Sequence, residues 1–523
     1  MQQKKLINHF NNLYPYILIS LIAFFINYHY GFVGLMPMDN TVLYNGGYRV
    51  LKGFTPFNDY WLVTGPILDY LTAFFFYIFG ISWKSFIIHS STFNLILSLG
   101  VYHLLTKLGL KKFFSIFYAI LVAILFYPVV GTPFVDHHST FFLILAYFCF
   151  AYSCYYQNPK YFRVIPIIFC LAFLAKQTPS IYGLFGMFFL ISIYCIIYRN
   201  FLRETLLNFV VGTLIAIAFV VLFFFLTGIN IKNFFDQYIF FASSIGEYRF
   251  SNYQLSLMDV FVKFKFINIF NLSLIFLLFF YYKKFEKYKN DFFLILIFLT
   301  LSLTLIFHQF YTLNQNFIFF LIPLLCSIVH FSLEKNFKKK KLTILLILVC
   351  IFAVGKYHLR FNEQRKFNEL ENVNLNLALN SDKISKDLKG LKWITYEFPD
   401  NPKKELEGIK DIMNIISKEK QKKMIITDYQ FIAPSLRIYD NSPNQWHHPG
   451  VSFPLSNNNY FEEYKKFFVN IIFKKELKVI YETINEKENT ITGLILDKDC
   501  FNQTRVHEMM VKLELSQNCE DFN

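Results

Sequence analysis

Long apolar runs alternate with short polar segments along the first 356 residues, and a mixed, charged pattern replaces them from residue 357 to residue 523. Most runs approach the ~20 residues that an α-helix needs to cross a bilayer. They cover residues 14–34, 64–80, 85–105, 113–130, 139–156, 164–175, 179–198, 205–227, 264–282, 292–307, 316–332 and 342–355. The pattern predicts an α-helical polytopic membrane domain over residues 1–356 and a separate soluble domain over residues 357–523.

The basic clusters between the runs indicate which runs cross the membrane. If every run crossed and Lys4 and Lys5 lay in the cytoplasm, the clusters would lie outside, against the positive-inside rule. The run 64–80 begins with a Gly-Pro pair and carries Asp69, which favours a helix at the membrane surface. Without this crossing the clusters become cytoplasmic. We therefore expect about eleven spans plus juxtamembrane helices, a cytoplasmic N-terminus and an outer soluble domain.

The soluble domain has the alternation expected of a small α/β fold. Strand-like runs at 392–398, 423–432 and 477–484 are separated by charged helical stretches near 403–420 and 460–472. Six of the eight cysteines lie in apolar runs and are interpreted as packing residues. The other two, in the soluble domain, are Cys500 and Cys519, and the sequence does not decide whether they pair.

Composition supports a membrane protein and argues against a nucleic-acid partner. The chain is 55% hydrophobic, with 68 Phe, and has a formal net charge of +15. A basic balance is the electrostatic footprint of nucleic-acid binders. Here most Lys and Arg of the membrane domain stand in short clusters between apolar runs, as in cytoplasmic loops.

The first outer loop, residues 37–66, places Asp39 and Asp59 at the edge of the membrane. An ionised carboxylate is costly there and is functional by default. An alternative is that Asp39 only caps an amphipathic helix that stops at Gly53, with Arg49 a solvated charge on its polar side. Both interpretations stay open.

The second outer loop carries Asp136, His137 and His138 at the mouth of a span. Asp and His are metal ligands, but three adjacent side chains do not all face one centre in a helix or a strand. A divalent metal would need ligands from another loop, so metal dependence stays open. The alternatives are hydrogen bonds to a polar ligand, or interfacial placement alone.

Lys176 and Gln177 stand between two apolar runs at the outer side. A lysine at this depth is costly unless it meets an anion such as a lipid phosphate, although it can also snorkel to the surface. The aromatic and acidic loop 228–260 suits contacts with sugars, and its Arg249 matches phosphate geometry bidentately. We expect Lys176, Gln177 and Arg249 to bind a phosphate.

The last outer loop is rich in amides. Its candidates for recognising sugar or acceptor hydroxyls are His308, Gln309, Asn314 and Gln315, although such residues can also be helix caps.

The order of these features resembles the GT-C superfamily of integral-membrane glycosyltransferases, which includes protein O-mannosyltransferases and lipid A aminoarabinose transferases. The resemblance covers most of residues 10–356 and rests on Met38-Asp39-Asn40, on Gly53 to Pro56 with Asp59, on Gly65-Pro66 and on Asp136-His137-His138. Asp39 matches the first-loop acid of the family, which is often the first of an acidic pair. Here Asn40 replaces the second acid.

The resemblance implies inverting transfer of a sugar from a polyprenyl-phosphate donor to an acceptor (lipid, glycan or protein) at the outer face of a plasma or inner membrane. In this scheme Asp39 is the general base, and Asp136 is a second catalytic residue that orients sugar or acceptor. Lys176 and Arg249 hold the departing phosphate. Asp59, His137 and His138 contact sugar or acceptor, and membrane lipids surround the protein. No nucleotide-binding glycine loop is required, and none is evident.

Two other classes fit less well. A transporter or flippase of a lipid-linked or small polar solute is the main alternative, but it tends to have polar groups near mid-membrane and internal repeats. A scaffold protein leaves the Asp, His and Lys residues of the outer loops unexplained.

Overall fold

The computed structural model describes residues 2–246, 257–312, 317–484, 490–516 and 519. The chain divides into two compact units, and neither is continuous in sequence. Unit 1 comprises Met1–Gly31, Ser90–Leu222 and Asn252–Phe367, and unit 2 comprises Phe32–His89, Phe223–Ser251 and Asn368–Asn523. The first outer loop therefore belongs to the same unit as the C-terminal residues.

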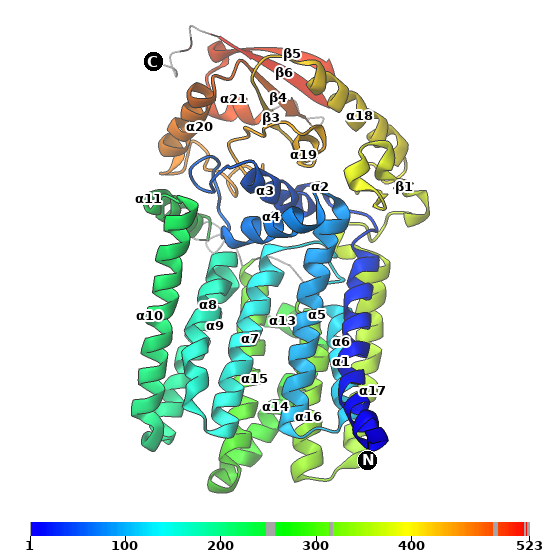
Figure 1. The fold of residues 1–523 in the computed structure, drawn as a ribbon, viewed down its shortest axis with the longest axis vertical. Helices are drawn as coiled ribbons and strands as arrows, with labels where there is room; N and C mark the ends of the chain where they lie inside the picture. The colour runs from blue at the N-terminus through cyan, green and yellow to red at the C-terminus, as the bar shows by residue number, and fades with distance from the viewer. Residues whose placement is uncertain (1, 247–256, 313–316, 485–489, 517–518, 520–523) are drawn as a thin grey trace. The chain divides into compact units, whose positions relative to one another are not determined.

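Unit 1 is a bundle of long helices that run alongside one another (Figure 1). Its α-helices are α1 (Gln2–Tyr30), α5 (Trp83–Leu108), α6 (Lys112–Leu125), α7 (Val135–Tyr156), α8 (Val164–Ala175), α9 (Gln177–Ile197), α10 (Leu202–Thr227), α13 (Leu257–Lys263), α14 (Lys265–Lys283), α15 (Phe285–Tyr311), α16 (Leu321–Asn336) and α17 (Lys340–Tyr357). The ends of α5 and α10 extend into unit 2. Short 3₁₀-helices are η1 (Pro159–Arg163), η2 (Arg199–Phe201), η4 (Phe317–Phe320) and η6 (Lys366–Asn368), and η5 (His358–Glu363) is a π-helix.

Within the described residues, nine helices are long and apolar enough to cross a membrane. The two other expected spans form α6 and α8, of only 14 and 12 residues. The surface run 64–80 forms α4 (Ile67–Phe79), whose 13 residues rise about 20 Å, less than the ~30 Å of a hydrocarbon core. The predicted polytopic helical fold is confirmed.

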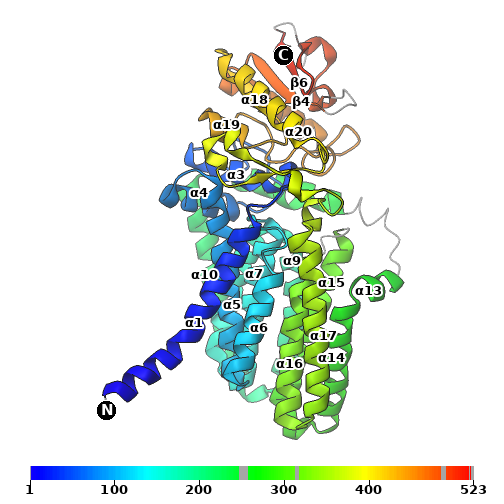
Figure 2. The same cartoon turned by 90° about the vertical axis from the view of Figure 1, so that its right-hand side faces the viewer.

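Burial orders the helices of unit 1 from its centre to its edge. In Phe317–Asn336, which contains α16, 94% of an 18-residue apolar stretch is buried. The corresponding share in Arg199–Thr227, which contains α10, is 17%. Figure 2 shows α14, α16 and α17 side by side, in agreement with their contacts. Buried amides add directional contacts, since Asn94 Nδ2 of α5 donates to the Ala23 and Ala123 carbonyls at 2.7 and 3.1 Å. These bonds join α5 to α1 and α6.

Unit 2 combines short helices with two small sheets. Its helices are α2 (Pro37–Asn40), α3 (Val42–Leu51), α4, α11 (Ile231–Phe234), the π-helix η3 (Phe235–Phe241), α18 (Pro402–Lys418), α19 (Ile432–Leu436), α20 (Phe461–Lys475) and α21 (Ile491–Ile495), with turns η7 (Leu375–Leu377), η8 (Ser381–Lys383), η9 (Lys386–Leu388) and η10 (Lys498–Cys500). Its strands are β1 (Leu379–Asn380), β2 (Lys392–Trp393), β3 (Lys423–Ile426), β4 (Val479–Thr483), β5 (Phe501–His507) and β6 (Met510–Leu515).

The main sheet has the order β3-β4-β6-β5, with β3 and β4 parallel and the other pairs antiparallel. A parallel pair needs a crossover connection, and α20 lies in it. The predicted α/β fold is confirmed, with β3, β4, α18 and α20 inside or close to the expected ranges. The run 392–398 is the exception, because it gives only β2, which pairs with β1 in a separate sheet.

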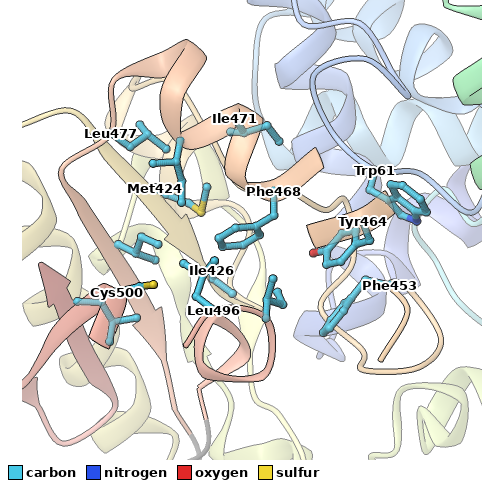
Figure 3. Packing of buried hydrophobic residues seen from close by; sticks show 14 of the residues in the cluster. Trp61, Met424, Ile426, Phe453, Tyr464, Phe468, Ile471, Leu477, Leu496 and Cys500 are labelled. Carbon is cyan, nitrogen blue, oxygen red and sulfur yellow. The ribbon is translucent and has the colours of Figure 1, made fainter. Parts of the chain in front are cut away.

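The core of unit 2 forms where α20 covers the sheet. Figure 3 shows Phe468 of α20 packed near Met424 and Ile426 of β3, with Trp61 of the first outer loop at the side of the cluster. The Trp61 backbone amide donates to the Pro443 carbonyl at 2.7 Å. Side-chain packing and backbone bonds therefore attach the first outer loop to the C-terminal residues.

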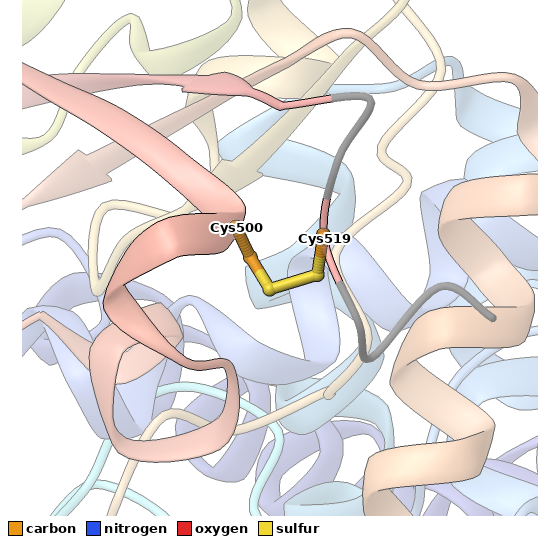
Figure 4. The surroundings of a disulfide bond; sticks show 2 residues. All are labelled: Cys500 and Cys519. Carbon is orange, nitrogen blue, oxygen red and sulfur yellow. A yellow bond between two sulfur atoms is a disulfide. The ribbon is translucent and has the colours of Figure 1, made fainter.

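Cys500 and Cys519 form a disulfide (Figure 4). Cys500 ends η10 just before β5, and Cys519 follows β6. The bond therefore fastens the two ends of the β5–β6 hairpin. The six cysteines of unit 1 are free and buried or half-buried, as their predicted packing role requires.

Candidate functional site

Asp136 is the centre of a buried polar cluster in unit 1. It lies in the first turn of α7, where the positive end of the helix dipole favours a carboxylate. Lys176 Nζ donates a hydrogen bond to Asp136 Oδ2 over 2.6 Å, and His308 Nε2 lies 3.4 Å from Asp136 Oδ1. The Asp136 and His308 side chains are fully buried, and Lys176 is 15% exposed. Three candidates from separate polar segments therefore meet at one point.

A break between α8 and α9 positions Lys176. Its backbone is extended, with φ −159° and ψ 137°, directly after the last residue of α8. The Lys176 carbonyl accepts hydrogen bonds from the hydroxyl of Ser139 at 3.1 Å and from that of Ser180 at 2.9 Å. These hydroxyls belong to α7 and α9 and satisfy a carbonyl at a helix end. They hold the lysine beside the carboxylate.

Two amide candidates lie at the ends of the neighbouring helices. Gln309 is buried in the last turn of α15, where its Nε2 is 3.2 Å from His308 Nδ1. Within the described residues, the Gln309 Oε1 atom has no hydrogen-bond partner. A buried amide oxygen in this state suits a ligand hydroxyl. Gln177 is the first residue of α9, next to Lys176.

His137 and His138 face different partners. The His137 ring lies 4.4 Å from the ring centre of Phe317, and the His138 ring lies 4.2 Å from that of Phe93. His138 Nδ1 also contacts the Tyr127 hydroxyl. In the part of the chain that the structure describes, no group of three or more His, Cys, Asp or Glu residues is arranged to hold a metal.

An apolar groove lies beside the Lys176 break. It has a volume of about 440 Å³ and is lined by residues of α8, α9 and α10, such as Phe169, Leu184 and Val220. Ser180, one of its few polar residues, donates to the Lys176 carbonyl. A chain of methyl and methylene groups matches this lining.

In unit 2, Asp39 lies half-buried in the short helix α2 and is not a helix cap. Met36 occupies the N-cap position of α2 and Thr41 that of α3, so the interpretation of Asp39 as the helix N-cap is wrong. The expected stop at Gly53 is correct, because this glycine follows the end of α3 with φ +84°.

Asp428 adds a second acid near Asp39. The Thr41 hydroxyl donates to the Asp428 carbonyl at 3.0 Å, so the residues after β3 lie against the start of α3. Removal from water, and then the negative charges of Glu397 and Asp39, raise the pKa of Asp428 to about 7. Its Oδ1 atom is buried without a hydrogen-bond partner among the described residues. Sequence reasoning missed Asp428 and Glu397 because neither stands in a local motif.

Arg49 is fully buried, not solvated as its place on the helix suggested. It pairs with Asp440, whose Oδ2 accepts from Arg49 Nη2 at 2.6 Å. Asp59 has a different environment: it accepts from the Thr55 amide at 2.9 Å and lies 3.5 Å from Lys474 Nζ. Asp59 therefore contacts other residues than Asp39 and Asp428 do.

Three candidates, Arg249, Asn314 and Gln315, lie outside the described residues.

The chain matches no protein-family model and no curated protein. Among solved structures it is similar to the crystal structure of ArnT from Cupriavidus metallidurans bound to undecaprenyl phosphate, with a TM-score of 0.50 and 10% sequence identity. The similarity covers 97% of this chain and 99% of that chain. At this identity the comparison shows the fold alone, and this agrees with the polytopic helical membrane fold predicted from the sequence.

Proposed function

We propose that this chain is a membrane glycosyltransferase that moves a sugar from a polyprenyl-phosphate-linked donor to a lipid, glycan or protein acceptor. The observation that carries the proposal is the buried Lys176–Asp136 pair, together with the bond from Ser180, a residue of the apolar groove, to the Lys176 carbonyl. The fold shared with ArnT, whose structure is described as bound to undecaprenyl phosphate, supports it.

The donor would bind in unit 1 through its two chemically different ends. The isoprenoid tail fits the apolar groove between α8, α9 and α10. The phosphate meets Lys176, with Gln177 and Arg249 as further donors. Because Lys176 is paired with Asp136, the incoming phosphate has to share or replace that carboxylate. Asp136 can then turn to His308, whose Nε2 is 3.4 Å away.

The transfer step needs a base and a stabilised leaving group. In our proposal Asp39 accepts the proton of the acceptor hydroxyl while its oxygen attacks the anomeric carbon. The bond from that carbon to the phosphate oxygen breaks, and the phosphate leaves with the electron pair. Lys176 and Arg249 stabilise the negative charge on the phosphate. Attack from the opposite side of the leaving group inverts the anomeric centre.

The other candidates would recognise hydroxyls. The candidates near Asp136 are His137, His308 and Gln309. The Gln309 Oε1 atom is available to accept a hydrogen bond. His138, whose Nδ1 contacts the Tyr127 hydroxyl, is a further candidate. The proposal includes no resident metal.

We further propose a cytoplasmic N-terminus and an outer location for unit 2 in a plasma or inner membrane. The positive-inside rule supports this orientation. The Cys500–Cys519 disulfide supports it as well, because such bonds persist in oxidising compartments and are rare in the cytosol.

The test is a transfer assay on the full chain in liposomes with a radiolabelled undecaprenyl-phosphate sugar. We expect release of undecaprenyl phosphate and loss of donor binding in Lys176→Gln. Lys335→Gln is a matched control, because Lys335 forms another partly buried ion pair of unit 1, with Asp291 at 2.7 Å. Unchanged donor binding in Lys176→Gln contradicts the phosphate site. Movement of the intact donor across the bilayer without release of phosphate would instead indicate a flippase.

A further inference from the structure

A polar cavity of about 380 Å³ lies wholly within unit 2. Three segments form it: the turn at residues 58–61, the α11–η3 segment and one face of α20. None of these residues belongs to the Asp136 cluster or to the Asp39–Asp428 neighbourhood. Its volume falls within the ~300–1,000 Å³ of small-molecule sites in proteins.

Aromatic residues line one part of this cavity. The rings of Trp61 and Phe467 meet edge to face at 5.7 Å. Trp61 is 2% exposed, and its indole N–H has no hydrogen-bond partner among the described residues. Leaving a buried donor unpaired is unfavourable. Together with Phe467, Trp61 forms an apolar part of the cavity wall.

Charged side chains line the rest, and they compensate one another. Three carboxylates and three lysines line the cavity: Asp59, Asp236, Glu463, Lys466, Lys474 and Lys475. Lys474 Nζ and Lys475 Nζ lie 3.5 and 3.8 Å from Asp59. Lys232, at the rim, pairs with Asp236 at 3.1 Å and with Glu463 at 3.2 Å. The formal charges of the lining residues sum to zero.

Amide side chains fill the spaces between these charges. Asn470 lines the cavity from the exposed face of α20, and Gln237 lines it from η3. The Gln237 side chain is already used, since it donates to the Phe57 carbonyl at 2.9 Å and accepts from the Leu62 amide at 2.9 Å. Gln237 therefore fixes the shape of the site, and Asn470 faces the ligand space.

We propose that this cavity is a binding site for a neutral saccharide. Sugar hydroxyls both donate and accept, which matches a wall of alternating carboxylates, amides and ammonium groups. An apolar face of a pyranose can pack on Phe467, which is only partly buried. An anion would meet three carboxylates, and an apolar ligand would leave the charged wall without partners. If the chain is the glycosyltransferase proposed above, the saccharide is part of a glycan acceptor.

Binding is measured by saturation-transfer difference NMR on the full chain in detergent, without any donor, using maltotriose, chitotriose and mannotriose as probes. We expect at least one probe to bind. We expect Asn470→Ala and Lys466→Ala each to weaken binding about tenfold, the effect of one lost hydrogen bond to a ligand. Lys465→Ala is the matched control, because it is the neighbouring lysine of α20 and does not line the cavity. Phe467→Ala removes the partly buried ring from the cavity wall and should also weaken binding.

The proposal is overturned if none of the three saccharides binds, if binding survives unchanged in both Asn470→Ala and Lys466→Ala, or if inorganic phosphate occupies the cavity instead. Thermal unfolding of each variant shows whether it is folded. Because the binding measurement uses no donor, a failure to bind saccharide does not contradict the proposed transfer reaction. A chain that binds saccharide without transferring sugar would reject only the proposed function.

Discussion

Lys176 and Asp136 form a buried ion pair in which the lysine at the α8–α9 break donates to the first-turn carboxylate of α7 over 2.6 Å. Sequence reasoning proposed an anion partner for Lys176 and a catalytic role for Asp136 independently. The structure gives each as the partner of the other. Asp136 therefore occupies the position that a donor phosphate would need, so the two anions should compete for Lys176.

Asp136→Asn tests this competition. Removing the carboxylate leaves the lysine charge uncompensated, and breaking a buried pair costs about 3–5 kcal/mol of stability. We expect a lower midpoint of thermal unfolding, together with tighter binding of undecaprenyl phosphate, which would restore part of the lost stability. Both are measured on the full chain in detergent, with and without the lipid.

The Lys335–Asp291 pair provides the control, since Asp291→Asn breaks an ion pair of similar length elsewhere in unit 1. It should lower stability without changing lipid affinity. Weaker lipid binding in Asp136→Asn would mean that Asp136 helps to bind the donor, and the idea of competition would have to be abandoned.

Asp39→Asn tests the proposed base. A general base contributes about 10²–10⁴-fold to the rate, so turnover should fall by that factor while donor affinity stays unchanged. Turnover is measured with a labelled lipid-linked sugar and affinity with undecaprenyl phosphate. Asp411→Asn, an exposed acid on α18, is the control and should behave like the parent. Parental turnover in Asp39→Asn would exclude Asp39 as the base.

The helices and several polar residues of unit 1 could be predicted because apolar runs near 20 residues have few other uses, and polar residues between them are conspicuous. Asp136, Lys176 and His308 were found in this way. Their mutual pairing was not, because ion pairs between segments far apart in sequence leave no local pattern. Arg49 shows the same limit: it looked solvated on its helix, yet its partner Asp440 lies 391 residues away.

The strand β5 was missed for a different reason. It is the edge strand of its sheet, and most of its side chains are exposed, so it lacks the apolar alternation of a half-buried strand. The interleaving of the two units was also beyond the sequence. The loop at residues 37–66 has the composition of a membrane connection, and only its contacts with distant residues, such as Trp61 with Pro443, assign it to unit 2.

Buried acids should make the protein less stable as the pH rises. Burial is the largest cause that raises the pKa of Glu405, Glu482, Asp69 and Asp428, each to about 7. A carboxyl whose pKa is higher in the folded state contributes stability that is complete below its unfolded value near 4 and lost as pH rises through 7. We therefore expect the midpoint of thermal unfolding to fall between pH 5 and pH 8.

Asp428→Asn should reduce this fall, because the amide cannot ionise beside Asp39 and Glu397. Relative to the parent, the variant should gain stability at pH 8 and not at pH 5. Asp411→Asn, whose parent side chain is exposed, should leave the pH profile unchanged. A midpoint that rises from pH 5 to pH 8 in the parent would contradict the protonated state of these acids.

Gly46→Ala tests the close packing of α3 on α4. A Cβ at Gly46 would lie 2.1 Å from Asp69 Oδ1 and 2.6 Å from Gln445 Nε2, so the hydrogen bond between these side chains would have to break or shift. Overpacking typically costs about 1–3 kcal/mol, and a buried carboxyl without its partner adds to this cost. We expect a clear decrease in the midpoint of thermal unfolding.

Gly355→Ala is the control, because that helical glycine has open space around it and alanine there should raise stability by about 0.5–1 kcal/mol. If both variants gain stability, the side chain of Asp69 does not lie against α3, and the Gly46 position carries no packing constraint.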